Sequence, residues 1–146
     1  SYDQLVALTV AKKPASFLVS DDIGRDTLYI ASEGQLLGLS FLKNEGDLDG
    51  DGGDEISYVV NWVDWSSQNT CHVMTYKRKK WKELYSFSIM DWQIPGLYRS
   101  FDNYKLFEKK MTEFPGLINK IEKNKILVRF INDDQAQDSA IVNLGK

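Results

Sequence analysis

Residues 46–56 read Gly-Asp-Leu-Asp-Gly-Asp-Gly-Gly-Asp-Glu-Ile, and they are the most informative stretch of the chain. Three aspartates alternate along it, at Asp47, Asp49 and Asp51, and Glu55 follows eight residues after the first of them. Ca²⁺ takes about six to eight oxygen ligands, and a loop that curls round one point supplies them from every second residue. The glycines between the acids allow the positive φ angles that such a curl requires. The stretch therefore predicts a cation-binding loop, because its acidic side chains would otherwise repel one another.

This loop has two other possible interpretations. A solvated turn is one, since Asp and Gly are ordinary turn residues, but such a turn uses about two or three of them and not an alternating triplet with a further acid. An EF-hand is the other, and its loop ends in a bidentate Glu at about position 12. That position is Tyr58 here, and residues 56–62 are β-branched and aromatic. They predict a strand and not a helix after the loop, which disfavours the EF-hand.

The same stretch resembles the calcium loop of FG-GAP/VCBS-type repeats, which occur in integrin α-subunit propellers and in many bacterial surface proteins. The likeness is direct over residues 46–56 and looser through the next hairpin to about Ile89, and the Phe-Gly and Gly-Ala-Pro segments of that family do not occur upstream. In that family the loop joins two β-strands and the Ca²⁺ is structural. The resemblance implies five ligands, which are the side chains of Asp47, Asp49, Asp51 and Glu55 and the carbonyl of Gly53. It places Asp54 beside the ion without binding it.

Composition limits the classes of protein to be considered. The chain has 146 residues, 42% of them hydrophobic and 12% aromatic, so it can bury a core as one domain over residues 1–146. The formal net charge is −3, and because the loop alone carries −5, the rest of the chain carries +2. This balance gives no broad field for nucleic acid or for an anionic membrane. No apolar run approaches the roughly 18 residues of a spanning helix, so we expect no membrane span.

Short runs with the composition of β-strands dominate the chain. They are Ser16–Val19, Thr27–Ala31, Leu36–Leu42, Ile56–Trp62, Cys71–Lys77, Trp81–Ile89, Ile126–Ile131 and Ala140–Leu144. Residues 76–81 predict a hairpin tip with solvated lysines; a nucleic-acid patch, the alternative, would need further basic residues in a stripe. The expected fold is mostly β, with α+β as the alternative. It is a small blade-like antiparallel sheet with one or two short helices after residue 95.

The segment 101–123 has a different period. Aromatic and apolar residues recur every three or four positions and predict an amphipathic helix; they are Phe101, Tyr104, Phe107, Met111 and Phe114. A strand over residues 104–107 is the alternative. Pro115-Gly116 interrupts the pattern, and a second short helix is expected to begin with Leu117, Ile118 and Ile121.

Two other segments are weak echoes of the acidic loop. Residues 19–30 and 131–142 each run strand, acidic loop, strand, but both lack the alternating triplet and the glycine pair. An Asx-rich turn is the simpler interpretation, and metal binding near Asp22 and Asp134 stays open. Two or three blades cannot close a propeller, which has about four or more, so we expect an isolated sheet.

The sequence offers no recognisable catalytic machinery. Cys71 is the only cysteine and His72 the only histidine, which excludes an internal disulfide and a zinc site built from these residue types. As neighbours on a strand they point to opposite faces and cannot act as a Cys-His pair. The glycines of residues 50–53 are flanked by acids, which repel phosphate. A pair of distant carboxylates for glycoside hydrolysis stays open, but we expect no catalytic residue and no enzyme.

Four tryptophans, at positions 62, 65, 81 and 92, are the remaining candidates for recognition. Trp is favoured at binding hot spots, although large aromatics more often fill a core. Trp65 precedes Ser66-Ser67-Gln68-Asn69 and is the one that we expect to be exposed and to bind a partner.

The expected function is that of a non-enzymatic calcium-binding β domain that acts in binding or recognition. Extracellular Ca²⁺ modules bind at about 10⁻⁴–10⁻³ M, which favours a bacterial periplasmic, cell-surface or secreted protein. A protein partner is expected, with a glycan as the alternative. The second hypothesis is a small inhibitor or immunity-type protein that neutralises a basic toxin or enzyme, and the third is a carbohydrate-binding module.

Overall fold

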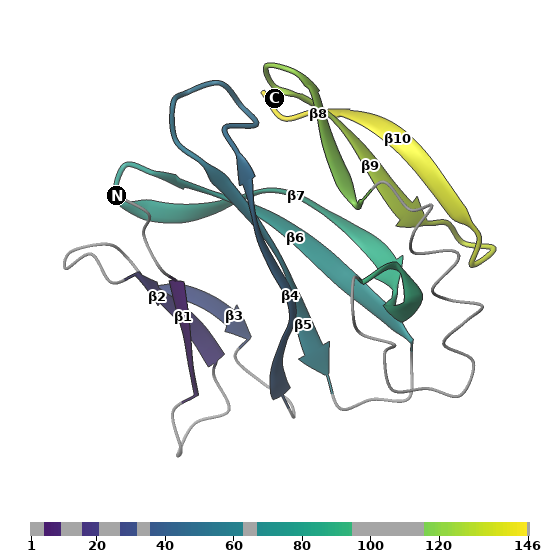
Figure 1. Cartoon of the computed structure of the whole chain (residues 1–146), viewed down its shortest axis with the longest axis horizontal. Helices are drawn as coiled ribbons and strands as arrows, with labels where there is room; N and C mark the ends of the chain where they lie inside the picture. The colour runs from purple at the N-terminus through teal and green to yellow at the C-terminus, as the bar shows by residue number, and fades with distance from the viewer. Residues whose placement is uncertain are drawn as a thin grey trace.

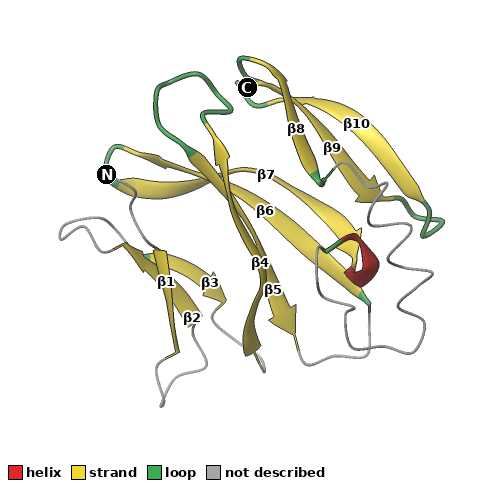
Figure 2. Ribbon diagram, in the orientation of Figure 1, coloured by secondary structure: helices red, strands yellow, loops and turns green. Residues whose placement is uncertain are grey.

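The computed structural model describes residues 5–9, 16–20, 27–31, 36–62, 67–94 and 116–145, and β-strands dominate them (Figure 1, Figure 2). The strands are β1 (Leu5–Thr9), β2 (Ser16–Ser20), β3 (Leu28–Ala31), β4 (Leu36–Gly46), β5 (Glu55–Trp62), β6 (Gln68–Lys77), β7 (Lys80–Met90), β8 (Ile118–Glu122), β9 (Lys125–Ile131) and β10 (Gln137–Asn143). One short 3₁₀ helix, η1 (Asp91–Gln93), follows β7. The predicted mostly-β fold is confirmed.

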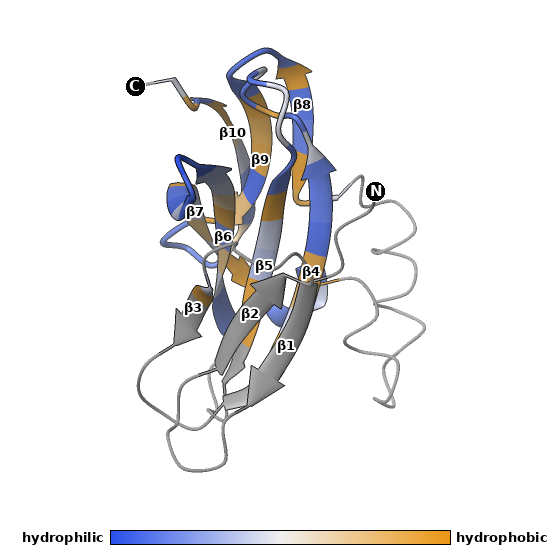
Figure 3. Ribbon diagram, turned by 90° about the vertical axis from the view of Figure 1, so that its left-hand side faces the viewer, coloured by the Kyte–Doolittle hydropathy of each residue, from blue (hydrophilic) through white to orange (hydrophobic). Residues whose placement is uncertain are grey.

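The strands form three antiparallel sheets. Their orders are β1-β2-β3, β4-β5-β6-β7 and β10-β9-β8. Each strand of the four-stranded sheet therefore pairs with its neighbour in the sequence, as in a meander. Figure 3 shows hydrophobic and hydrophilic residues mixed along the strands, which is expected of a sheet whose two faces have different neighbours.

The four-stranded sheet is covered on both faces, and β5 places buried apolar side chains on each of them. Ile56, Tyr58 and Val60 point to one face, where they are buried in a cluster with Leu28 of β3. Val59 points to the other face and is 0% exposed. Successive strand residues alternate between faces, so a strand buried on both sides needs apolar residues in both registers.

The second face of this sheet packs against the C-terminal sheet. Val59, Cys71 and Val73 join the same core cluster as Ile126 and Val128 of β9, and β9 lies against β7 (Figure 1). All five side chains are 0% exposed. Burying a side chain of this size stabilises by about 1.5–3 kcal/mol relative to leaving it in water, so this contact is a main source of stability.

The hairpin predicted at residues 76–81 is confirmed. Lys77 pairs with Lys80, and the two residues between them, Arg78 and Lys79, have φ angles of 52° and 63°. Positive φ at both central residues matches the twist of the flanking strands in a two-residue hairpin. Neither residue is a glycine or an asparagine, so the turn adopts this conformation without the residue types that favour it.

The prediction that a second short helix begins with Leu117, Ile118 and Ile121 is wrong. Residues 118–122 form β8, which pairs with β9 through a tight turn in which Asn124 has a φ of 61°. Ile118 is buried, but Ile121 is 49% exposed. The two side chains therefore do not share the buried apolar face that the predicted helix would have. The segment 101–115, where the first helix was expected, lies outside the described residues. The sequence also gave no sign of β1.

None of the helices among the described residues has the length and apolar character needed to cross a membrane.

Candidate metal centre

The acidic loop connects β4 to β5, as the sequence predicted. Gly46 pairs with Glu55 at its base, and three glycines, Gly46, Gly50 and Gly52, have φ angles of 74°, 77° and 92°. Leu48 turns inward, is 1% exposed and belongs to the core shared with the C-terminal sheet. The loop therefore curls on its glycines while one apolar side chain anchors it.

Asp47 lies at the centre of this curl. Its Oδ1 accepts hydrogen bonds from the amides of Gly50 (2.6 Å) and Asp51 (3.1 Å), and its Oδ2 accepts one from Gly52 (3.1 Å). The backbone of the loop thus folds around one carboxylate. Such charge-assisted bonds hold the carboxylate in one orientation.

Glu55, the first residue of β5, is buried beneath the loop with 0% exposure. Its Oε2 accepts hydrogen bonds from the amides of Leu48 (2.7 Å) and Asp49 (3.3 Å), and its Oε1 accepts one from the hydroxyl of Thr75 (2.8 Å). Burial raises the pKa of Glu55; these hydrogen bonds oppose the shift, and the charge of Asp49 adds to it. A nearby cation would favour the ionised form of this side chain.

Three of the predicted ligands come together. Carboxylate oxygens of Asp47, Asp49 and Glu55 all lie within 4.8 Å of one another, and the latter two residues are buried. Oxygens about 2.3–2.6 Å from a Ca²⁺ are separated by at most about 5 Å, when they lie on opposite sides of the ion. The three carboxylates are therefore close enough to share one ion.

The other predicted ligands lie outside this group. Asp51 is exposed, and its carboxylate accepts hydrogen bonds from the Gly53 amide (2.9 Å) and from Lys77 (3.0 Å to Nζ). The Gly53 bond, and then that from Lys77, lowers the pKa of Asp51. Gly53 is exposed. Asp54 accepts a hydrogen bond from the Asn44 side chain (2.9 Å) on the neighbouring strand.

Lys77, at the end of β6, contacts the acidic loop, and sequence reasoning missed this contact. It was expected to be solvated, but its ammonium group bonds both Asp49 and Asp51. These bonds, with Asp49 first, raise the pKa of Lys77. The contact joins residues 28 positions apart, and the hairpin pattern alone gave no signal for it.

The loop also contacts the C-terminal sheet. The amide of Asn124 donates to the carbonyl of Leu48 (3.1 Å), and the ammonium of Lys120 donates to the carbonyl of Asp47. The side chain of Lys123 packs so closely on Gly50 that a Cβ there would lie 2.6 Å from its Cγ. The candidate centre therefore touches both sheets of the main core.

The echo at residues 131–142 is an Asx turn in this structure. The side-chain oxygen of Asn132 accepts hydrogen bonds from the amides of Asp134 (3.0 Å) and Ala136 (3.1 Å). The exposed acids there include Asp133, Asp134 and Asp138. The first echo has residues 21–26, with Asp22, outside the described residues.

Cys71 and His72 lie on opposite faces of β6, as predicted. Cys71 is 0% exposed, and burial raises the pKa of its thiol. His72 stacks on Tyr58 with ring centroids 4.9 Å apart, and its Nδ1 lies 2.6 Å from Glu83. Burial, helped by the charge of Glu83, raises the pKa of Tyr58 to about 12. The two side chains make no pair.

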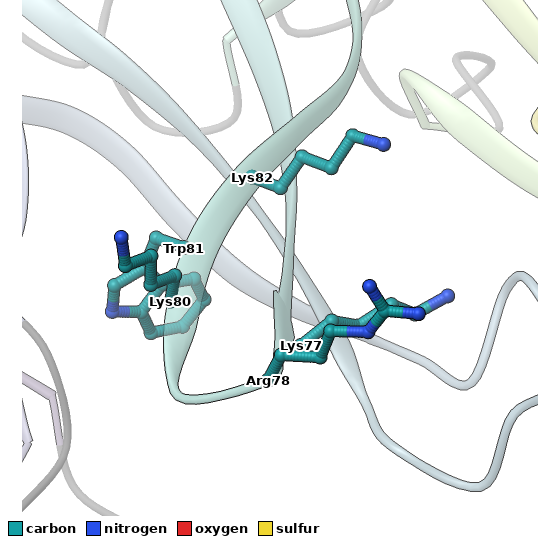
Figure 4. A pocket seen from close by; sticks show the side chains of 5 residues that line it. All are labelled: Lys77, Arg78, Lys80, Trp81 and Lys82. Atoms are coloured by element: carbon teal, nitrogen blue, oxygen red, sulfur yellow. The ribbon is translucent and has the colours of Figure 1, made fainter.

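Trp81, on β7, is a partly buried tryptophan. Trp81 meets Tyr76 edge-on, with centroids 5.2 Å apart, and packs on the cluster around Tyr58. It also lines a shallow hollow of about 550 Å³ at the hairpin tip with Lys77, Arg78, Lys80 and Lys82 (Figure 4). Trp65, the expected partner-binding residue, lies outside the described residues.

Comparison with other proteins adds no family to this picture. No protein-family model, no curated protein and no solved structure matches the chain.

Proposed function

We propose that this chain is a non-enzymatic calcium-binding β domain that acts in binding or recognition. The observation that carries the proposal is the convergence of Asp47, Asp49 and Glu55, whose carboxylate oxygens lie within 4.8 Å of one another. Glu55 is fully buried and takes part in none of the ion pairs that the structure describes, and a buried carboxylate needs a compensating positive charge. A metal ion held by the loop would supply it.

The chemistry of the donors favours Ca²⁺ over other metals. The three groups are carboxylates, which are hard ligands, with no thiol or imidazole among them. Mg²⁺ demands a near-ideal octahedron at about 2.0–2.1 Å, whereas Ca²⁺ accepts irregular sets of about six to eight oxygens. The loop is irregular and has one exposed acid, Asp51, beside the three carboxylates, so it suits Ca²⁺ better than Mg²⁺. Water would complete the coordination.

The proposed role of the ion is structural. The loop joins β4 to β5 and also contacts Asn124 and Lys120 of the C-terminal sheet. An ion bound there would hold these elements together and present a defined surface to a partner. Extracellular Ca²⁺ modules work at about 10⁻⁴–10⁻³ M, so we propose a periplasmic, cell-surface or secreted setting.

Calorimetric titration of chelator-treated protein with Ca²⁺ tests the proposal, with Glu55→Gln as the matched variant. Gln can keep every hydrogen bond seen here, because its oxygen can accept the Leu48 and Asp49 amides and its amide can donate to the Thr75 hydroxyl. We expect wild type to bind one ion and the variant to bind at least about tenfold more weakly, because a charged ligand is lost.

Thermal unfolding supplies the second measurement. A ligand that binds only the native state stabilises it by about 2.7 kcal/mol at a hundredfold excess over Kd. Calcium should therefore raise the melting temperature of wild type, and Mg²⁺ should do so weakly. Wild type with no binding heat and an unchanged melting curve would refute the calcium assignment.

A further inference from the structure

We propose that Lys77 is a built-in competitor of the metal ion, so that calcium binds by displacing its ammonium group from Asp49 and Asp51. This inference rests on the proposed calcium site and concerns its regulation. It makes the affinity of the loop depend on a residue of the β6–β7 hairpin and not on the loop alone.

The contacts of Lys77 are those of a substitute cation. Its Nζ bonds Oδ2 of Asp49 and lies 3.0 Å from Oδ2 of Asp51. The Asp49 side chain is 4% exposed, so water gives it little solvation. Lys77 provides the positive charge that this buried carboxylate needs in the absence of metal.

An ion bound by the three carboxylates would compete with the ammonium group for Asp49. Asp49 belongs to the group of three carboxylates that lie within 4.8 Å of one another. An ion bound there would lie a few ångströms from a Lys77 ammonium that shared the same carboxylate, and like charges at that distance repel strongly when partly buried. Binding of the ion therefore requires the ammonium to leave.

Lys77 is placed so that it can leave. Its side chain is 39% exposed, and it is the last residue of β6, next to the turn. Figure 4 shows its side chain running beside that of Arg78, away from the turn. Release would also free Asp51, which the family resemblance makes a ligand.

The other lysines near the loop have different roles. Lys120 bonds the carbonyl of Asp47 and not a carboxylate, and Lys123 packs on Gly50. Among the ion pairs that the structure describes, those to the loop acids Asp49 and Asp51 both come from Lys77. Removal of its charge should therefore have an effect that removal of a neighbouring charge does not.

The test compares Lys77→Met with Lys80→Met in calorimetric titrations with Ca²⁺. Lys80 pairs with Lys77 across the hairpin and is exposed. Its replacement removes one positive charge from the same hairpin and leaves the ion pairs of the loop acids in place. We expect Lys77→Met to bind Ca²⁺ about three- to tenfold more tightly than wild type, as befits the loss of a charge-assisted pair. Lys80→Met should stay within about twofold of wild type, by screened charge alone.

Thermal unfolding closes the thermodynamic cycle. Without metal, Lys77→Met should melt below wild type, because Asp49 loses its partner; with saturating Ca²⁺ the difference should shrink, because the pair is already broken. Lys77→Gln serves as a second variant with the same prediction if the Met protein folds poorly.

The outcomes separate the two proposals. Equal affinity of wild type and the Lys77 variants would overturn the competition while leaving the calcium site intact. Tighter binding by the Lys77 variants than by wild type, with Lys80→Met unchanged, would support the competition. Absence of binding in all of them would refute the calcium site and the competition with it.

Discussion

At the scale of single residues, the loop shows two acidic side chains in different states. Glu55 is buried with three hydrogen-bond donors around it, whereas Asp51 is exposed and engaged by Lys77. Burial raises the pKa of Glu55, whereas the hydrogen bonds from Gly53 and Lys77 lower the pKa of Asp51. In the proposed calcium centre, Glu55 is therefore already held in place, whereas Asp51 would have to leave Lys77 to become a ligand.

The ranking of Asp51 and Asp54 is the first prediction. Asp51→Asn should weaken Ca²⁺ binding by about tenfold or more, because it removes a ligand. Asp54→Asn should weaken it less than about threefold through lost long-range charge, since Asp54 bonds Asn44 instead. Calcium titrations of both variants check this. The opposite ranking would mean that the ligand register is wrong.

Cys71 gives the second prediction. Burial raises the pKa of the Cys71 thiol, and the side chain is 0% exposed. At pH 8, the native protein should therefore react with a thiol reagent at least about a hundredfold more slowly than the unfolded protein. Absorbance after addition of a disulfide reagent, with and without denaturant, measures the ratio. Fast reaction of the native protein would contradict this packing of β6.

At the scale of elements, the β6–β7 hairpin holds non-glycine residues in a conformation that glycine adopts more easily. Lys79 has a φ of 63°, where an L-residue costs roughly 1–2 kcal/mol relative to the ordinary helical region. The strands on both sides impose the turn, since they pair in register up to Lys77 and Lys80. Tertiary pairing here outweighs local preference.

Lys79→Gly is the third prediction. It should raise the free energy of unfolding by about 0.5–1 kcal/mol, the gain from relieved strain exceeding the entropy of the extra glycine. Lys80→Gly, one residue later in the strand, should instead destabilise the protein. Urea unfolding of the two variants measures both signs. Destabilisation by Lys79→Gly would show that the turn is not strained.

Elements determined by local interactions could be predicted from the sequence, whereas elements determined by contacts between distant residues could not. The strand–loop–strand at residues 46–62 was predictable because alternation and glycines are local. Residues 118–122 were not, because pairing with β9 decides between helix and strand there. The ion pair of Lys77 was missed for the same reason, since it joins two hairpins.

At the scale of the whole molecule, the loop is part of the core and not an appendage. Leu48 is buried among residues of two sheets, and its carbonyl accepts the Asn124 amide (3.1 Å). Loss of loop order should therefore be felt in the C-terminal sheet. The part of the loop around Leu48 is expected to unfold together with the core.

Leu48→Ala is the fourth prediction. It should lower the free energy of unfolding by about 2–5 kcal/mol, the usual cost of a cavity at a buried Leu. It should also weaken Ca²⁺ binding, because the loop loses its anchor. Leu42→Ala, at a site 39% exposed, is the control and should change stability by less than about 0.5 kcal/mol. Urea unfolding in chelator and a calcium titration measure the two effects.

The covering of both faces of β5 has a consequence for amide hydrogen exchange. Its backbone is paired on one side with β4 and on the other with β6, and apolar clusters exclude water above and below it. Its protected amides, such as that of Val59, have no local route to solvent, so they should exchange only when the whole domain opens. Calcium should slow them by the same factor by which it raises the folding equilibrium constant. The loop amides that donate to Asp47 can open locally, so they should exchange much faster than those of β5. Their exchange rates should fall when Ca²⁺ occupies the proposed centre.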